Sequence, residues 1–78
     1  MKFEEILKAE YGKERVTIDY SNQSIDNTIG IKILSKDGKK EFKAEGVLFI
    51  DNSVEIGGRR YNVDDLILAL NASFNKEN

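Results

Sequence analysis

The sequence predicts a two-layer α+β domain in which an N-terminal and a C-terminal helix pack on an antiparallel meander sheet of about five strands. Apolar residues recur with a helical period near both ends of the chain and with a period of two in its middle. The expected connections are short, and short connections favour antiparallel pairing because parallel strands need long crossovers. With 78 residues the chain is expected to form one domain, residues 1–78.

The N-terminal helix is expected over Lys2–Tyr11. Its apolar residues lie on one helical stripe, namely Phe3, Ile6, Leu7 and Tyr11. Glu4 and Lys8 have the spacing and order of a stabilising ion pair on a helix. Gly12 suits the left-handed conformation that often ends a helix, so we expect the helix to stop there.

Strict alternation then predicts two strands. The alternating apolar positions are Val16, Ile18 and Tyr20 in the first strand and Ile29, Ile31 and Ile33 in the second. The segment between them, residues 21–28, is polar and is expected to be a loop. Asp37 and Gly38 form the strongest turn signal of the chain, because both residue types tolerate the positive φ values of a hairpin turn. We therefore expect a hairpin at residues 36–39.

A third strand is expected from Lys40 to about Glu45, with Phe42 and Ala44 facing inward. Residues 47–50 then form a continuous apolar run. The polar residues 51–53 that follow are expected to turn the chain.

A second hairpin and a helix complete the prediction. Val54 and Ile56 alternate with a polar residue, residues 57–58 are both glycine, and a further strand starts at Arg59. The final helix is expected from about Val63 to about Phe74, with Asn62 as its N-cap. The stripe that it buries is expected to contain Leu66, Ile67, Leu70 and Phe74.

The composition favours binding over chemistry. The sequence contains no histidine and no cysteine, which removes the commonest general base and the strongest nucleophile. We expect a protein that is not an enzyme and that needs no cofactor. A divalent-metal site from Asp51, Asp64 and Asp65 is the alternative, but these residues lack the spacing of a calcium loop, so no metal site is predicted.

Basic charge is concentrated in residues 32–43, where five lysines against Asp37 and Glu41 give a net charge of +3 in a chain of net charge −2. A nucleic acid or a nucleotide could bind there through its phosphates. The candidate residues are Lys36, Lys39, Lys40 and Lys43. The interpretation that we favour is that the lysines protect an exposed sheet edge against pairing with other chains.

Arg59, Arg60 and Tyr61 are the candidates for a protein-binding site, together with Asp51 and Glu55. Arginine and tyrosine are enriched among the residues that anchor protein interfaces. The structural alternative is that the arginines pair with nearby carboxylates, including Asp51 and Glu55, while Tyr61 packs against the start of the last helix.

The first half of the chain resembles a known family. The helix at residues 3–11, the strand at 16–20, the polar loop at 21–28 and the segment 29–42 with its Asp-Gly turn resemble small anti-CRISPR inhibitors of Cas9. The resemblance implies a non-enzymatic inhibitor from a phage or mobile element that binds its target through acidic surfaces imitating DNA. This chain departs from that pattern in its lysine-rich hairpin, its mild net charge and its additional strands, so no residue role is transferred.

The sequence therefore predicts a small non-catalytic protein-binding module that inhibits a partner by occluding its surface. One alternative is binding of nucleic acid or nucleotide through the lysines, and another is a structural subunit of a larger assembly. A homo-oligomer is also compatible with so small a core. No membrane segment is expected, since no run approaches about 18 apolar residues. A cytoplasmic location is expected because the first ten residues are too charged for a signal peptide.

Overall fold

The computed structural model describes residues 2–20 and 27–75. The predicted loop at residues 21–28 falls mainly outside this range, and its last residue, Thr28, already belongs to a strand. The elements follow in the order α1 (Lys2–Tyr11), β1 (Val16–Asp19), β2 (Thr28–Leu34), β3 (Glu41–Leu48), β4 (Val54–Ile56), β5 (Arg59–Tyr61) and α3 (Val63–Asn75). The predicted α+β class, with a helix at each end, is confirmed.

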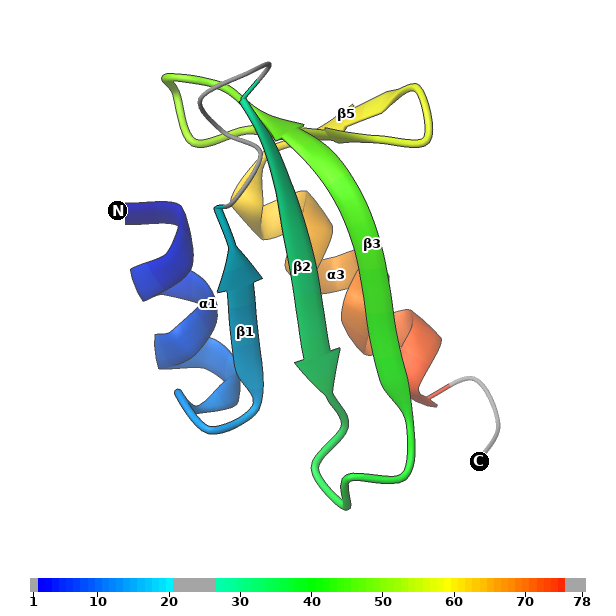
Figure 1. Cartoon of the computed structure of the whole chain (residues 1–78). Helices are drawn as coiled ribbons and strands as arrows, with labels where there is room; N and C mark the ends of the chain where they lie inside the picture. The colour runs from blue at the N-terminus through cyan, green and yellow to red at the C-terminus, as the bar shows by residue number, and fades with distance from the viewer. Residues whose placement is uncertain (1, 21–26, 76–78) are drawn as a thin grey trace.

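The strands form one five-stranded antiparallel meander in which each strand pairs with its neighbour in sequence. In Figure 1, α3 passes behind the sheet and α1 lies beside β1. The buried side chains of both helices join those of the sheet in one core. Its largest fully buried members are Phe3, Leu7, Ile29, Ile31, Ile33, Leu66, Leu70 and Val54. The period-two pattern thus identified the inward face of β2 correctly.

Both helices have the boundaries that their end signals indicate. Gly12 takes a φ of 94° and donates its N–H to the carbonyl of Lys8, which ends α1. The Lys8 ammonium lies 2.6 Å from the carboxylate of Glu4, so the predicted ion pair forms. At the start of α3, Oδ1 of Asn62 accepts the N–H of Asp65 at 2.8 Å, which confirms the predicted N-cap.

The prediction for the third strand was wrong at its C-terminal end. β3 continues through Gly46 to Leu48, because Val47 and Leu48 pair with β4. A Cβ atom at Gly46 would lie only 2.8 Å from the carbonyl oxygen of Glu55, so the absence of a side chain lets the β4–β5 hairpin approach β3 closely. The remainder of the apolar run, Phe49 and Ile50, leaves the sheet and enters a turn.

The turn at Asp37 and Gly38 is present as predicted. The Ser35 N–H donates to the carbonyl of Lys40 at 2.9 Å, which closes the turn. Oδ1 of Asp37 accepts the Lys39 N–H and the Ser35 hydroxyl, at 2.9 and 2.7 Å. These hydrogen bonds hold the pKa of the Asp37 carboxyl below its ordinary value.

Candidate functional site

The turn between β3 and β4, residues 49–53, is held by its own polar groups. The N–H and the hydroxyl of Ser53 both donate to Oδ1 of Asp51, at 2.9 and 2.6 Å. The Phe49 N–H donates to the carbonyl of Ser53, and the Asn52 N–H donates to the carbonyl of Phe49. Asn52 has a φ of 69°, a left-handed conformation that asparagine adopts more readily than most residues. The turn therefore has a well-defined conformation.

Arg60 reaches from β5 to this turn and fastens the hairpin to it. Its Nε donates to Oγ of Ser53 at 2.8 Å and its Nη2 donates to Oδ2 of Asp51 at 3.1 Å. Its guanidinium carbon lies 4.0 Å from the centre of the Phe49 ring. Hydrogen bonds from Ser53, together with the charge of Arg60, hold the pKa of the Asp51 carboxyl below its ordinary value. Arg60 and Asp51 thus have the structural role that the sequence left open.

The side chain that this turn displays is Ile50. It is fully exposed, although it belongs to an apolar run and neighbours a half-buried phenylalanine. Among the residues that the structure describes, Leu68 on α3 is the other large apolar side chain that is exposed, at 68%. Removing the side chain of a fully exposed isoleucine from water is favourable by about 1.5–3 kcal/mol. Sequence reasoning missed Ile50, and the only signal for it was its position directly before the turn residues Asp51 and Asn52.

The β4–β5 hairpin places the other predicted residues on its two faces. Gly57 and Gly58, with φ values of 61° and 79°, form its turn. The guanidinium carbon of Arg59 lies 5.2 Å from the centre of the Tyr61 ring, and Tyr61 is half-buried against the core. Glu55 is exposed and lies opposite Arg60 in the strand register.

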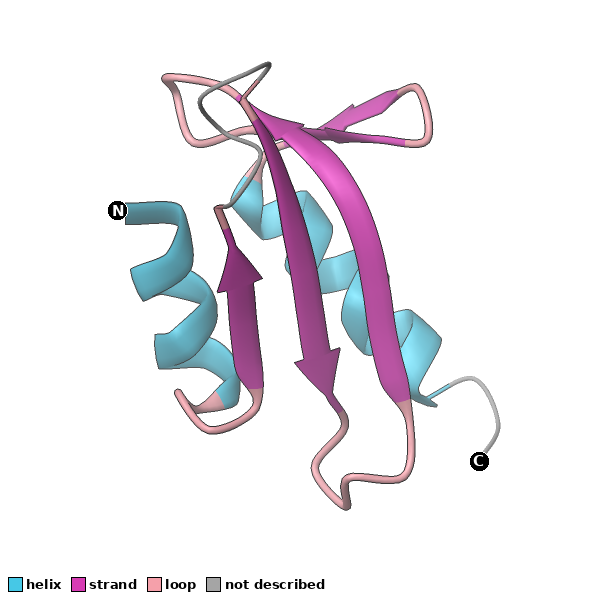
Figure 2. Cartoon of the chain, viewed as in Figure 1, coloured by secondary structure: helices cyan, strands magenta, loops and turns pink. Residues whose placement is uncertain are grey.

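The five residues predicted for protein binding therefore lie on one hairpin and the turn attached to it. Asp51, Arg60 and Glu55 lie on one side, whereas Arg59 and Tyr61 lie on the other. We call residues 49–53 together with the β4–β5 hairpin the turn–hairpin surface. In Figure 2 both loops lie at the upper end of the long strands, where the turn between β3 and β4 protrudes to the left and the β4–β5 hairpin to the right.

The structure does not gather the four lysines of the β2–β3 hairpin on one face. Lys36 and Lys39 are exposed in the turn, while Lys43 points to the open face of the sheet, opposite Lys32. Nζ of Lys40 donates to the carbonyl of Phe74 at 2.9 Å and so caps the C-terminal end of α3. A single phosphate-binding array of all four lysines is therefore not formed.

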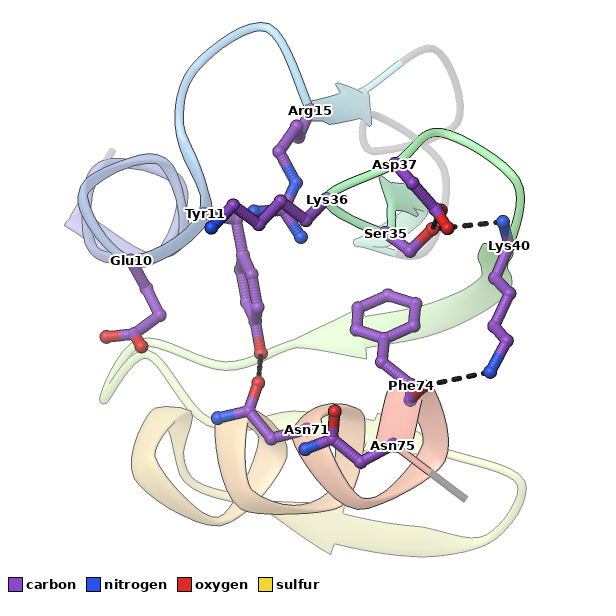
Figure 3. A pocket seen from close by; sticks show the side chains of 10 residues that line it. All are labelled: Glu10, Tyr11, Arg15, Ser35, Lys36, Asp37, Lys40, Asn71, Phe74 and Asn75. Carbon is purple, nitrogen blue, oxygen red and sulfur yellow. Dashed lines mark hydrogen bonds between the residues drawn. The ribbon is translucent and has the colours of Figure 1, made fainter. Parts of the chain in front are cut away.

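A pocket of about 770 Å³ lies between the C-terminal ends of the two helices and the β2–β3 turn (Figure 3). Its cationic groups are Arg15, Lys36 and Lys40, and its carboxylates are Glu10 and Asp37. This volume lies in the range of small-molecule sites. Sequence reasoning did not connect Arg15 with the two lysines, because they meet only through the tertiary fold.

Two aromatic rings and an amide form part of the lining of this pocket. The Tyr11 hydroxyl donates to Oδ1 of Asn71 at 2.9 Å, and its ring makes an edge contact with Phe74, the centroids being 6.2 Å apart. Burial raises the pKa of the Tyr11 hydroxyl. Arg15 donates through Nε to the carbonyl of Leu34, and its guanidinium carbon lies 5.4 Å from the centre of the Tyr11 ring. These contacts leave the terminal nitrogens of Arg15 without a hydrogen-bond partner among residues 2–20 and 27–75.

The alternative of a metal site finds no support in the described part of the chain. Among residues 2–20 and 27–75 no three acidic side chains are placed to hold a metal ion together, so Asp51, Asp64 and Asp65 do not converge. Asp64 and Asp65 lie in the first turn of α3, where negative charge favours the helix dipole. Neither described helix has the length and apolar character required to cross a membrane.

Comparisons of the chain with protein-family models, curated proteins and solved structures found no match.

Proposed function

We propose that this chain is a small, non-catalytic protein-binding module. Its turn–hairpin surface binds a partner protein and blocks the part of the partner that it contacts. The observation that carries this proposal is the fully exposed side chain of Ile50 on a turn that Asp51, Ser53 and Arg60 hold in place.

The anatomy of this surface supports the proposal. Interfaces are commonly anchored by a few apolar or arginine side chains surrounded by polar groups that exclude water. Here Ile50 is the exposed apolar side chain of the turn, and the charged pair Asp51–Arg60 lies at the next residue of the same turn. Because the turn is already ordered, little conformational freedom is lost when a partner covers it.

The resemblance of residues 2–42 to small anti-CRISPR inhibitors supports an inhibitor of phage or mobile-element type as the specific form of this module. A cleavage assay with a purified, guide-loaded Cas9 tests this part separately. Loss of DNA cleavage in the presence of excess chain supports it. Unchanged DNA cleavage would exclude an anti-CRISPR inhibitor of Cas9. The proposed binding surface is tested independently of this assay.

The binding surface is tested by affinity capture from a lysate of the source organism, followed by mass spectrometry. Three baits are compared: the unaltered chain, Ile50→Asp, and the matched control Leu68→Asp. Both substituted side chains are exposed, so neither variant should change stability by more than about 0.5 kcal/mol. We expect a protein that the unaltered chain and Leu68→Asp retain and that Ile50→Asp loses. Equal retention by all three baits would contradict the proposed surface.

Nucleotide or nucleic-acid binding is the second candidate, because the pocket of Figure 3 holds Arg15, Lys36 and Lys40 beside two aromatic rings. This function predicts an affinity that falls steeply between about 50 and about 200 mM salt. Titration of a labelled oligonucleotide and of a nucleotide measures that dependence. Lys36→Gln should weaken binding, whereas Lys43→Gln, on the open face of the sheet, should not. A flat salt response would remove this candidate.

A further inference from the structure

β3 has a long edge that no strand of the described chain covers. β2 pairs with β3 from Glu41 to Val47, whereas β4 pairs only with Val47 and Leu48. Beyond those two residues the β4–β5 hairpin turns away, as Figure 2 shows. Along Glu41 to Gly46 the second edge of β3 is therefore open within the residues that the structure describes.

The main-chain groups on this open edge can be assigned from the hydrogen bonds to the other side. The Leu48 N–H donates to the carbonyl of Asn27, and the Lys40 carbonyl accepts the N–H of Ser35. The main-chain N–H and C=O groups of the even-numbered residues of β3 thus point toward β2. Because successive residues of a strand alternate in direction, the N–H and C=O groups of the odd residues point to the open edge. These residues are Glu41, Lys43 and Glu45. Such an edge is a template for an added strand.

An apolar groove lies beside this edge on the inner side of the sheet. It has a volume of about 100 Å³. Its lining includes Phe42 of β3, Ile56 and Tyr61 of the hairpin, and Leu66, Ala69 and Leu70 of α3. A strand added to β3 would direct every second side chain to this inner side. An aliphatic side chain at those positions would extend the core into the groove.

The charged side chains on the outer side of β3 indicate whether a second copy of this chain or a segment of another protein pairs with the open edge. Glu41, Lys43 and Glu45 are all exposed on the open face. A second copy of the chain, paired antiparallel along the whole open edge, would place Lys43 opposite Lys43 and Glu41 opposite Glu45. Like charges directly opposite each other are destabilising. The edge therefore disfavours its own copy in that register and favours a strand with the order basic, acidic, basic.

We propose that the open edge of β3 binds an extended segment of another protein by strand addition, antiparallel to β3. The segment presents basic, acidic and basic side chains opposite Glu45, Lys43 and Glu41, with apolar residues between them. This recognition combines main-chain hydrogen bonds for affinity with alternating side chains for specificity. It goes beyond the turn–hairpin surface and does not depend on whether Ile50 contacts a partner.

The probe is the peptide Thr-Lys-Leu-Glu-Val-Lys-Thr, compared with the charge-reversed peptide Thr-Glu-Leu-Lys-Val-Glu-Thr. Binding is followed by fluorescence anisotropy, and amide exchange is followed by NMR of the isotope-labelled chain. We expect the first peptide to slow exchange at the amides of Glu41, Lys43 and Glu45. The reversed peptide should bind about tenfold more weakly, because three cross-strand charge pairs become repulsive.

Two variants make the test specific. Lys43→Glu should lower the affinity of the chain for the first peptide. The same variant should regain affinity for a version of that peptide in which lysine replaces the central glutamate. Lys36→Glu makes the same charge change in the exposed turn and should alter neither affinity. Equal binding of both peptides, or unchanged exchange at the three amides at millimolar peptide, overturns the proposal. Protection of those amides in the free chain, together with a dimer in sedimentation, also overturns it, since a second copy would then occupy the edge.

Discussion

Replacing Gly46 by alanine tests how the turn–hairpin surface is attached to the sheet. A Cβ atom there would lie 2.8 Å from the carbonyl oxygen of Glu55, 2.8 Å from Cγ2 of Val54 and 2.9 Å from Cγ1 of Ile56. Carbon atoms in good contact are about 3.5–4.0 Å apart, so the backbone of β4 has to move. Overpacking of this kind costs about 1–3 kcal/mol. In a chain of this size that corresponds to a melting temperature lower by roughly 4–24 °C.

Urea unfolding followed by circular dichroism measures this loss, and Gly30→Ala provides a matched control. The added Cβ at Gly30 would meet only the Cβ of Asp19, at 3.3 Å, on the open face of the sheet. We expect the control to stay within about 0.5 kcal/mol of the unaltered chain. If Gly46→Ala is as stable as the control, the close approach of the hairpin to β3 is wrong.

Three further predictions concern the core, a helix cap and acid stability. Leu70→Ala removes a side chain that is 1% exposed, so urea unfolding should show a loss of about 2–5 kcal/mol, and a loss below 1 kcal/mol would contradict the packing of α3 on the sheet. Asn62→Ala removes the N-cap of α3 and should lower the unfolding free energy by about 1 kcal/mol; no change would mean that the cap contributes nothing. Hydrogen bonds from Lys8 and Tyr20 lower the pKa of the Glu4 carboxyl from its ordinary value of 4.5. The stability from this group is complete above that value and is lost as the pH falls through the lower pKa of the folded state. Tyr20→Phe should therefore lose less stability than the unaltered chain between about pH 5 and about pH 3, and equal losses in acid unfolding curves would count against the contact.

The fold could be predicted largely because local signals agree with its tertiary contacts. The four-residue spacing of Phe3, Leu7 and Tyr11 gave the buried face of α1, and alternation gave the buried residues of β2. The end of β3 could not be predicted in the same way. Gly46 is a poor strand former when considered locally, but it is required where the hairpin approaches the strand.

The candidate site was less predictable than the fold. The sequence placed Ile50 only at the end of the apolar run 47–50, and its exposure depends on the turn that Asp51 and Ser53 form. Arg60 was identified as a candidate, but its part in ordering that turn depends on contacts across the hairpin. The open edge of β3 also has no local signal, because it results from β4 being shorter than the strand with which it pairs.

Site-specific photo-crosslinking shows whether the turn–hairpin surface contacts a protein. A photoreactive amino acid replaces Ile50 in one form of the chain and Leu68 in another, and both forms are irradiated in a lysate of the source organism. We expect a discrete crosslinked protein with the probe at position 50 and none with the probe at position 68. The same crosslink from both positions, or a crosslink from position 68 alone, would contradict it.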